Sequence, residues 1–121
     1  MTSTPCNIAA ALPRLAAERP DQPAIRCPGR RRPGNGLAAY DVVLDYATLD
    51  ARSEAIAAGL ARHGIGRGVR TVVMVRPSPE FFLLMFALFK AGAVPVLVDP
   101  GIDRRALKQC LDEAQAQAFI G

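Results

Sequence analysis

The sequence has only one histidine, His63, and three cysteines that are far apart from one another, Cys6, Cys27 and Cys110. A zinc site needs cysteine or histidine ligands at short spacings, so these residues exclude a zinc centre. His63 falls in the last turn of an expected helix, where a positive charge suits the helix dipole. We therefore interpret it as a capping or surface residue rather than a catalyst, and the cysteines as reduced and structurally neutral.

Phosphate-binding motifs are also missing. No Gly-Lys-Ser or Gly-Lys-Thr sequence occurs, which excludes a P-loop. The glycine-rich segment 64–68 follows an expected helix and precedes an expected strand, the reverse of the order that brings a helix N-terminus to a pyrophosphate; we interpret it as a turn. Open α/β sheets bind ligands beyond the carboxyl ends of their strands, here residues 76–78 and 99–101, and neither segment has the glycines of a phosphate cradle.

Only one long apolar run is present, residues 81–98, with Lys90 as its single charge. This run could be a membrane span or part of a buried core. Three features argue against a membrane span: Lys90 lies at the centre of the run, Gly92 and Pro95 would interrupt a helix, and the residues after Gly92 favour strand geometry. Residues 1–20 also lack the basic start and compact apolar core of a secretory signal. We expect a cytoplasmic protein without a transmembrane segment.

Acidic residues are fewer than basic ones, 11 against 15, which raises the question of a nucleic-acid partner. The densest basic cluster is Arg30–Arg32, which lies among turn-forming prolines and glycines and has no interleaved aromatic residue. We favour a solvated loop over a phosphate-binding patch and expect no nucleic-acid partner.

The pattern that is present is the alternation of an α/β protein. We expect an amphipathic helix over residues 7–19, then a hairpin of strands 24–27 and 42–46. A helix over residues 48–63 follows, with Thr48 as its N-cap. The rest of the chain has the rhythm of a βαβαβ unit with a parallel sheet.

The segment 72–102 predicts one βαβ crossover. After a strand at 72–75, Ser78 is a suitable N-cap and Pro79 a suitable first helical residue. The helix is then apolar without a break to Phe89, so we expect it to be buried on several sides and Gly92 to end it. We expect Lys90 to lead this helix out toward water, and the next strand to begin at Val94.

A last helix is expected after Asp103, its N-cap, with a one-sided apolar stripe that consists of Leu107, Cys110, Leu111 and Ala114. Residues 118–121 resemble the start of another buried strand. A natural domain seldom ends on the first step of a core strand, so we expect the chain to be a truncated piece of a longer protein.

No complete catalytic constellation is visible. Asp112 and Glu113 are adjacent on a helix and point to different sides. Asp41 and Asp45 share strand parity, but nothing marks them as buried. Ser78 has no histidine near it in sequence for a triad. We assign no catalytic, cofactor-binding or metal-binding residue.

Four segments in order carry a resemblance to a known family: 8–25, ending in Arg-Pro-Asp-Gln-Pro-Ala-Ile; 45–49, Asp-Tyr-Ala-Thr-Leu; 57–64, Ala-Ala-Gly-Leu-Ala-Arg-His-Gly; and 79–100, with Lys-Ala-Gly-Ala-Val-Pro-Val-Leu-Val-Asp-Pro. They resemble the N-terminal portion of the adenylate-forming superfamily, which contains acyl-CoA synthetases, fatty-acyl-AMP ligases and luciferases. Within it, segment 86–102 is most similar to the β-lactone synthetases of olefin biosynthesis, because Pro95 comes early and Val-Leu-Val precedes Asp99.

The resemblance implies an ATP-dependent ligase that activates a fatty carboxylate as its acyl-adenylate, with Mg2+ assisting. In the β-lactone branch, the 3-hydroxyl group of the acyl-adenylate would displace AMP internally, without coenzyme A. Other enzymes of an olefin pathway would be partners. The fold would be an N-terminal helix and β-hairpin followed by a βαβαβ parallel-sheet unit, a truncated part of the enzyme's large N-terminal domain.

Residues 1–121 would then be an incomplete N-terminal subdomain, inactive alone and binding neither ATP nor Mg2+, because the family's phosphate loop would lie beyond Gly121. The alternative is that the 121 residues act by themselves as a small α/β binding or interaction module without catalysis.

Overall fold

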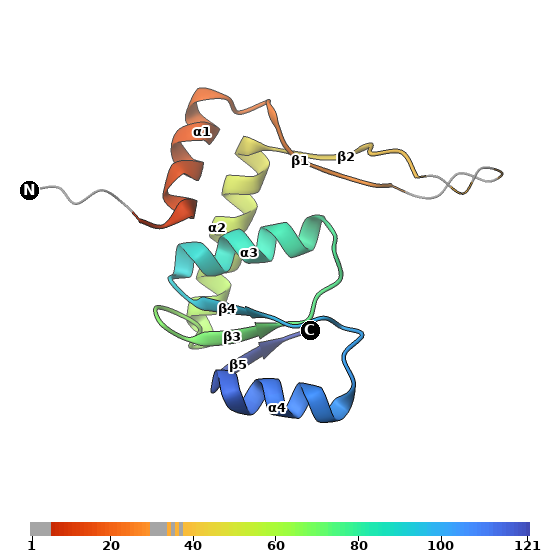
Figure 1. Ribbon diagram of the computed structural model, residues 1–121. Coiled ribbons are helices and arrows are strands. Elements are labelled where there is room, and N and C mark those ends of the chain that lie inside the picture. Colours follow the sequence, from red (N-terminus) through yellow and green to blue (C-terminus); the bar gives the residue numbers. More distant parts are fainter. Residues whose placement is uncertain (1–5, 30–33, 35, 37) are drawn as a thin grey trace, which may run out of the picture.

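The computed structural model describes residues 6–29, 34, 36 and 38–121. The chain begins with the 3-10 turn η1 (Ile8–Ala11), the helix α1 (Leu12–Glu18) and a hairpin of β1 (Pro23–Cys27) and β2 (Val42–Asp45). It continues with α2 (Tyr46–Arg62), β3 (Arg70–Val73), α3 (Pro79–Ala91), β4 (Val94–Leu97), α4 (Arg104–Ala114) and β5 (Ala118–Ile120). The expected helix, hairpin and βαβαβ unit are confirmed (Figure 1). The cluster Arg30–Arg32 lies outside the described residues.

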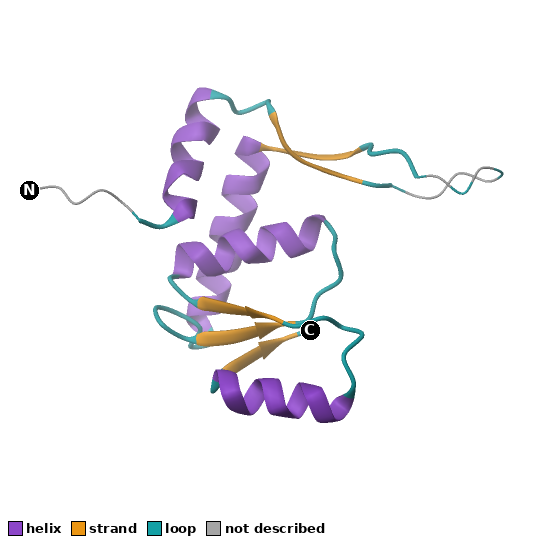
Figure 2. Cartoon of the chain, in the orientation of Figure 1, coloured by secondary structure: helices purple, strands orange, loops and turns teal. Residues whose placement is uncertain are grey.

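The three strands of the second half form a parallel sheet in the order β4-β3-β5. Val72 of β3 is in register with Val96 on one side and Phe119 on the other. The connection from β4 to β5 therefore crosses over β3, and the preferred right-handed crossover places α4 on the face opposite α3. Figure 2 shows these two helices on either side of the strands. Val72 and Val73 point to opposite faces and are 0% and 2% exposed, so both faces of β3 are covered.

The boundaries of α3 are set by short-range chemistry, as the sequence predicts. The Ser78 hydroxyl accepts a hydrogen bond from the Phe81 N–H (3.2 Å), and Pro79 occupies the first turn. Gly92 ends the helix in the left-handed region, with φ of 75°. Any side chain at this position would be strained by that backbone angle, which explains the glycine.

Two groups of buried residues meet at α3. One joins α1, the hairpin, α2 and α3, and the other joins the sheet to the opposite side of α3; Ile56 of α2 packs against both. Their buried members are Leu12, Leu44, Leu49 and Leu83 in the first, and Val73, Leu84, Leu88 and Ala93 in the second. The expectation that α3 is buried on several sides is confirmed.

The expected N-cap of α2 is wrong by three residues. The N-cap is Asp45, not Thr48: the Asp45 carboxylate accepts a hydrogen bond from the Thr48 N–H at 2.7 Å. Tyr46, which we expected in the strand, is the first residue of the helix. Aspartate is among the best N-caps, and it takes this role here because β2 ends directly at the helix. Hydrogen bonds from the Thr48 side chain, and then from its backbone, lower the pKa of Asp45 below its ordinary value of 3.8.

Two other expectations need adjustment. The first strand of the sheet runs from Arg70 to Val73 rather than over 72–75, because polar Arg70 pairs with β4 ahead of the apolar run.

In α4, Asp103 is the N-cap as expected, with its carboxylate 2.8 Å from the Ala106 N–H. The apolar stripe of α4 is only half-buried, and Cys110 is exposed.

Replacing Asp45 by alanine removes the acceptor for the Thr48 N–H and is expected to lower the free energy of unfolding at neutral pH. The pKa of Asp45 is lower in the folded state than in the unfolded state. Its contribution to the free energy of unfolding is therefore complete at pH values above the unfolded-state pKa, and it is lost as the pH falls through the folded-state pKa. Urea titrations at several pH values check this: the wild type and Asp45→Ala should differ at neutral pH and converge in acid. Asp112→Ala, at an exposed position of α4, is the control and should show no such difference.

Candidate functional site

The carboxyl ends of the parallel strands are the first place to look for a ligand site, because open α/β sheets bind ligands there. At this edge, the Ser78 hydroxyl donates to the Arg76 carbonyl (2.9 Å) while it caps α3. The Asp99 carboxylate accepts from the Gly101 N–H (2.9 Å) and closes a turn after β4. Both side chains therefore stabilise their own loops, and the hydrogen bonds given for them within the described part of the chain are local ones.

Lys90 does not lead α3 out toward water, and that expectation is wrong. Its side chain is 9% exposed, and its ammonium nitrogen lies 2.6 Å from Asp50 Oδ1 and 3.1 Å from Glu54 Oε2. It also donates to the Asp50 carbonyl oxygen at 2.9 Å. An ammonium group has three N–H donors, and three oxygens of α2 surround this one. Lys90 thus joins the C-terminal end of α3 to the first half of α2.

Sequence reasoning missed these partners, although a signal was present. Asp50 and Glu54 are four residues apart, so they lie on one face of α2. That face of α2 is acidic, and the buried helix α3 has a single basic residue, Lys90. Nothing in the sequence says which cation they face, because the pairing depends on how α2 crosses α3.

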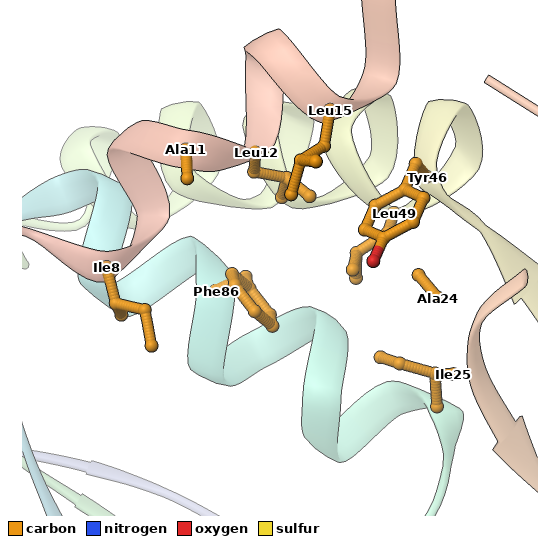
Figure 3. Close-up of a pocket in the computed structure, with 9 residues that line it drawn as sticks. All are labelled: Ile8, Ala11, Leu12, Leu15, Ala24, Ile25, Tyr46, Leu49 and Phe86. Carbon is orange, nitrogen blue, oxygen red and sulfur yellow. The ribbon is translucent and has the colours of Figure 1, made fainter. Parts of the chain in front are cut away.

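An apolar pocket of about 240 Å3 opens between η1, α1, β1, α2 and α3. Figure 3 shows its lining, in which the Tyr46 hydroxyl is the one polar side-chain group; the residues are Ile8, Ala11, Leu12, Leu15, Ala24, Ile25, Tyr46, Leu49 and Phe86. Such a lining can hold a small apolar group by removing it from water, but it has no nucleophile or carboxylate with which to transform it.

The remaining sequence candidates are dispersed. The segment 64–68 is a turn between α2 and β3, as expected, with φ of 80° at Gly64 and 79° at Gly68. It lies at the amino end of the sheet, opposite the edge where ligands bind. His63 is exposed at the end of α2, with its ring Nδ1 2.9 Å from the Gly59 carbonyl oxygen, which confirms a capping role. Asp112 and Glu113 are exposed on α4.

Within residues 6–29, 34, 36 and 38–121, no three acidic, histidine or cysteine side chains are grouped to hold a metal ion. The same residues include no helix with the length and apolarity needed to cross a membrane.

Comparison with known proteins identifies the family. The family model for AMP-binding enzymes matches residues 12–121, and the chain belongs to this family. Two proteins named olefin beta-lactone synthetase are close relatives. The one from Stenotrophomonas maltophilia is 86% identical over 97% of the chain, and the one from Xanthomonas campestris is 85% identical over 98%. The chain spans about a fifth of their length, 21% in each case. The resemblance to adenylate-forming enzymes is confirmed.

Solved structures confirm the fold. The N-terminal subdomain of NpsA from Klebsiella oxytoca matches 95% of this chain with a TM-score of 0.79 and 24% identity, and the match covers 27% of that chain. NpsA in complex with 3-hydroxyanthranilyl-AMSN matches 96% of this chain with a TM-score of 0.80 and 23% identity, over 21% of that chain. The described residues thus share the fold of the matched part of the NpsA N-terminal subdomain.

Replacing Lys90 by methionine keeps the aliphatic stem but removes the charge, the two hydrogen bonds to Asp50 and the ion pair with Glu54. We expect the free energy of unfolding to fall by about 1–3 kcal/mol, because the partly buried Asp50 carboxylate loses its partner; the exposed Glu54 carboxylate remains solvated and adds little. Urea titration at low protein concentration measures this. Arg14→Ala is the matched control: its pair with Glu18 is exposed at 3.9 Å, and its loss should cost less than about 0.5 kcal/mol. Equal effects of the two variants would contradict a special role for Lys90.

Proposed function

We propose that these 121 residues are the N-terminal part of an ATP-dependent, adenylate-forming ligase that converts a 3-hydroxy fatty acid into a β-lactone. The observation that carries the proposal is the 86% identity to an olefin beta-lactone synthetase along nearly the whole chain. Membership of the AMP-binding enzyme family supports the use of ATP. One solved relative of the same fold is an N-terminal subdomain in complex with anthranilyl-AMSN.

The proposed reaction has two chemical stages. The fatty carboxylate first attacks the α-phosphorus of ATP, which forms the acyl-adenylate and releases pyrophosphate. In this stage Mg2+ would bind the phosphate groups and offset their negative charge. The 3-hydroxyl oxygen of the same acyl group then attacks the activated carbonyl carbon, a C–O bond closes the four-membered ring, and AMP leaves. Because the 3-hydroxyl nucleophile belongs to the same acyl group, the second stage needs neither coenzyme A nor the binding of another molecule.

Residues 1–121 are proposed to be an incomplete N-terminal subdomain that serves as scaffold. The groups that hold ATP and Mg2+ and carry the reaction would lie outside this segment. In support, the polar side chains at the carboxyl edge of the sheet are used in local turns, and the buried cation Lys90 is held by α2. We also propose a cytoplasmic location, where ATP is supplied, and association with other enzymes of an olefin pathway.

The full-length protein that contains this segment tests the proposal. It should catalyse ATP–pyrophosphate exchange that depends on a fatty acid, and mass spectrometry should detect a β-lactone when a 3-hydroxy fatty acid is supplied without coenzyme A. The same fatty acid lacking the 3-hydroxyl group is the matched control: it should support exchange but give no lactone. Formation of acyl-CoA only when coenzyme A is added would instead identify an acyl-CoA synthetase.

The isolated 121-residue chain should catalyse no ATP–pyrophosphate exchange. It should also associate with itself or pack loosely, because apolar side chains such as Leu97 and Phe119 are exposed on open sheet edges. Light scattering at increasing concentration measures the association. A monomer that remains stable at high concentration with a sharp two-state melt would favour the alternative of an independent binding module.

A further inference from the structure

The helix α4 forms an outer layer of the described structure, and its half-buried apolar stripe lies toward the sheet (Figure 2). Its opposite side is an exposed polar face, defined by four residues at spacings of three, four and seven: Arg105, Lys108, Gln109 and Asp112. A wholly polar face suits water or a polar partner, and it is a poor surface for burial in the apolar core of a larger domain.

The charges of α4 run against its helix dipole. Arg104 and Arg105 occupy the first turn, where acidic residues are favoured, and Asp112 and Glu113 occupy the last turn, where basic residues are favoured. The helix α3 has the usual arrangement, acidic in its first turn and basic in its last. The order of charges in α4 therefore does not stabilise the helix of a single copy.

The opposite charges of the polar face are also not used within the chain. Among the described residues, no ion pair joins Arg105 or Lys108 to an acidic side chain, although Asp112 is four residues from Lys108. A basic residue ahead of an acidic one is the weaker order for such a pair. Glu113 accepts a hydrogen bond from the Gln109 side chain at 3.0 Å, within its own helix. Arg105 and Asp112 are thus left as exposed opposite charges, two turns apart.

We infer that the polar face of α4 is an interface between two copies of this protein, whose α4 helices lie antiparallel about a two-fold axis. The axis passes between positions 108 and 109, so Arg105 of each copy faces Asp112 of the other, and Lys108 faces Gln109. The occupant is argued from charge complementarity, because reversing the helix direction exchanges the positive and negative ends of the face. Each copy also places a negative charge beside the first turn of the other helix, which offsets the unfavourable charge order. The inference does not rest on the proposed function.

One pair of short helices buries less area than a stable dimer needs, about 1,600 Å2, so we expect a weak dimer of the full-length protein that dissociates on dilution. Sedimentation equilibrium measures the association. Raising NaCl from about 50 mM to about 500 mM should weaken it about tenfold, because the ion pairs are exposed to solvent. A wild-type protein that stays monomeric at all concentrations would overturn the inference, and so would association that salt does not weaken.

Charge reversal on the full-length protein identifies the surface. Arg105→Asp gives the polar face two acidic groups near its ends, and Asp112→Arg gives it basic groups only. Each variant should be monomeric by itself because like charges meet, whereas an equimolar mixture of the two should associate. The double variant should associate with itself as the wild type does. Single variants that associate normally, or a mixture that stays monomeric, would overturn the inference.

Two controls separate the interface from folding and from net charge. Both single changes place charges in the sense that the helix dipole favours, so the melting temperatures of dilute samples should not fall below the wild-type value. Arg14→Asp, at an exposed position of α1, changes the net charge by as much as Arg105→Asp does. It should leave the association unchanged, and a loss of association equal to that of Arg105→Asp would overturn the inference.

Discussion

The burial of α3 between α2 and the parallel sheet is the constraint on which the rest of the structure depends. Leu83 faces one buried cluster while Leu84 and Leu88 face the other, so a single helix connects the N-terminal half of the chain to the sheet. Burying a leucine side chain contributes about 1.5–3 kcal/mol each, which makes this helix a major source of stability. Lys90 completes the arrangement by binding α2 near the C-terminal end of α3.

Much of the fold can be predicted from the sequence because its signals are short-range. Ser78 and Gly92 define α3 through bonds within a few residues, and the hairpin and the βαβαβ order follow from apolar runs separated by turns. The errors have a different origin. Asp45 and Thr48 are both suitable N-caps, and the end of β2 decides between them. The ion pairs of Lys90 depend on the crossing of two helices distant in sequence, which no local pattern encodes.

The family can be identified from this segment by residues that serve packing rather than by the residues of a site. The motifs that carry the resemblance are determined by packing, as in the apolar stretch of α3 and the strand that follows Gly92. The polar residues at the carboxyl edge of the sheet close their own turns, as Ser78 and Asp99 do.

The position of β3 at the centre of the sheet also imposes an order of events on the growing chain. Its neighbour β4 follows after one helix, but its other neighbour, β5, comes later: the Arg70 N–H bonds to the side chain of Gln117, 47 residues further along. During synthesis, β3 can complete one side of its hydrogen bonding while the other side waits for β5 to emerge. Such distant pairing slows folding and leaves apolar strand surface exposed meanwhile. The central strand of this protein is therefore the earliest part of the sheet to be made and among the last to be fully enclosed.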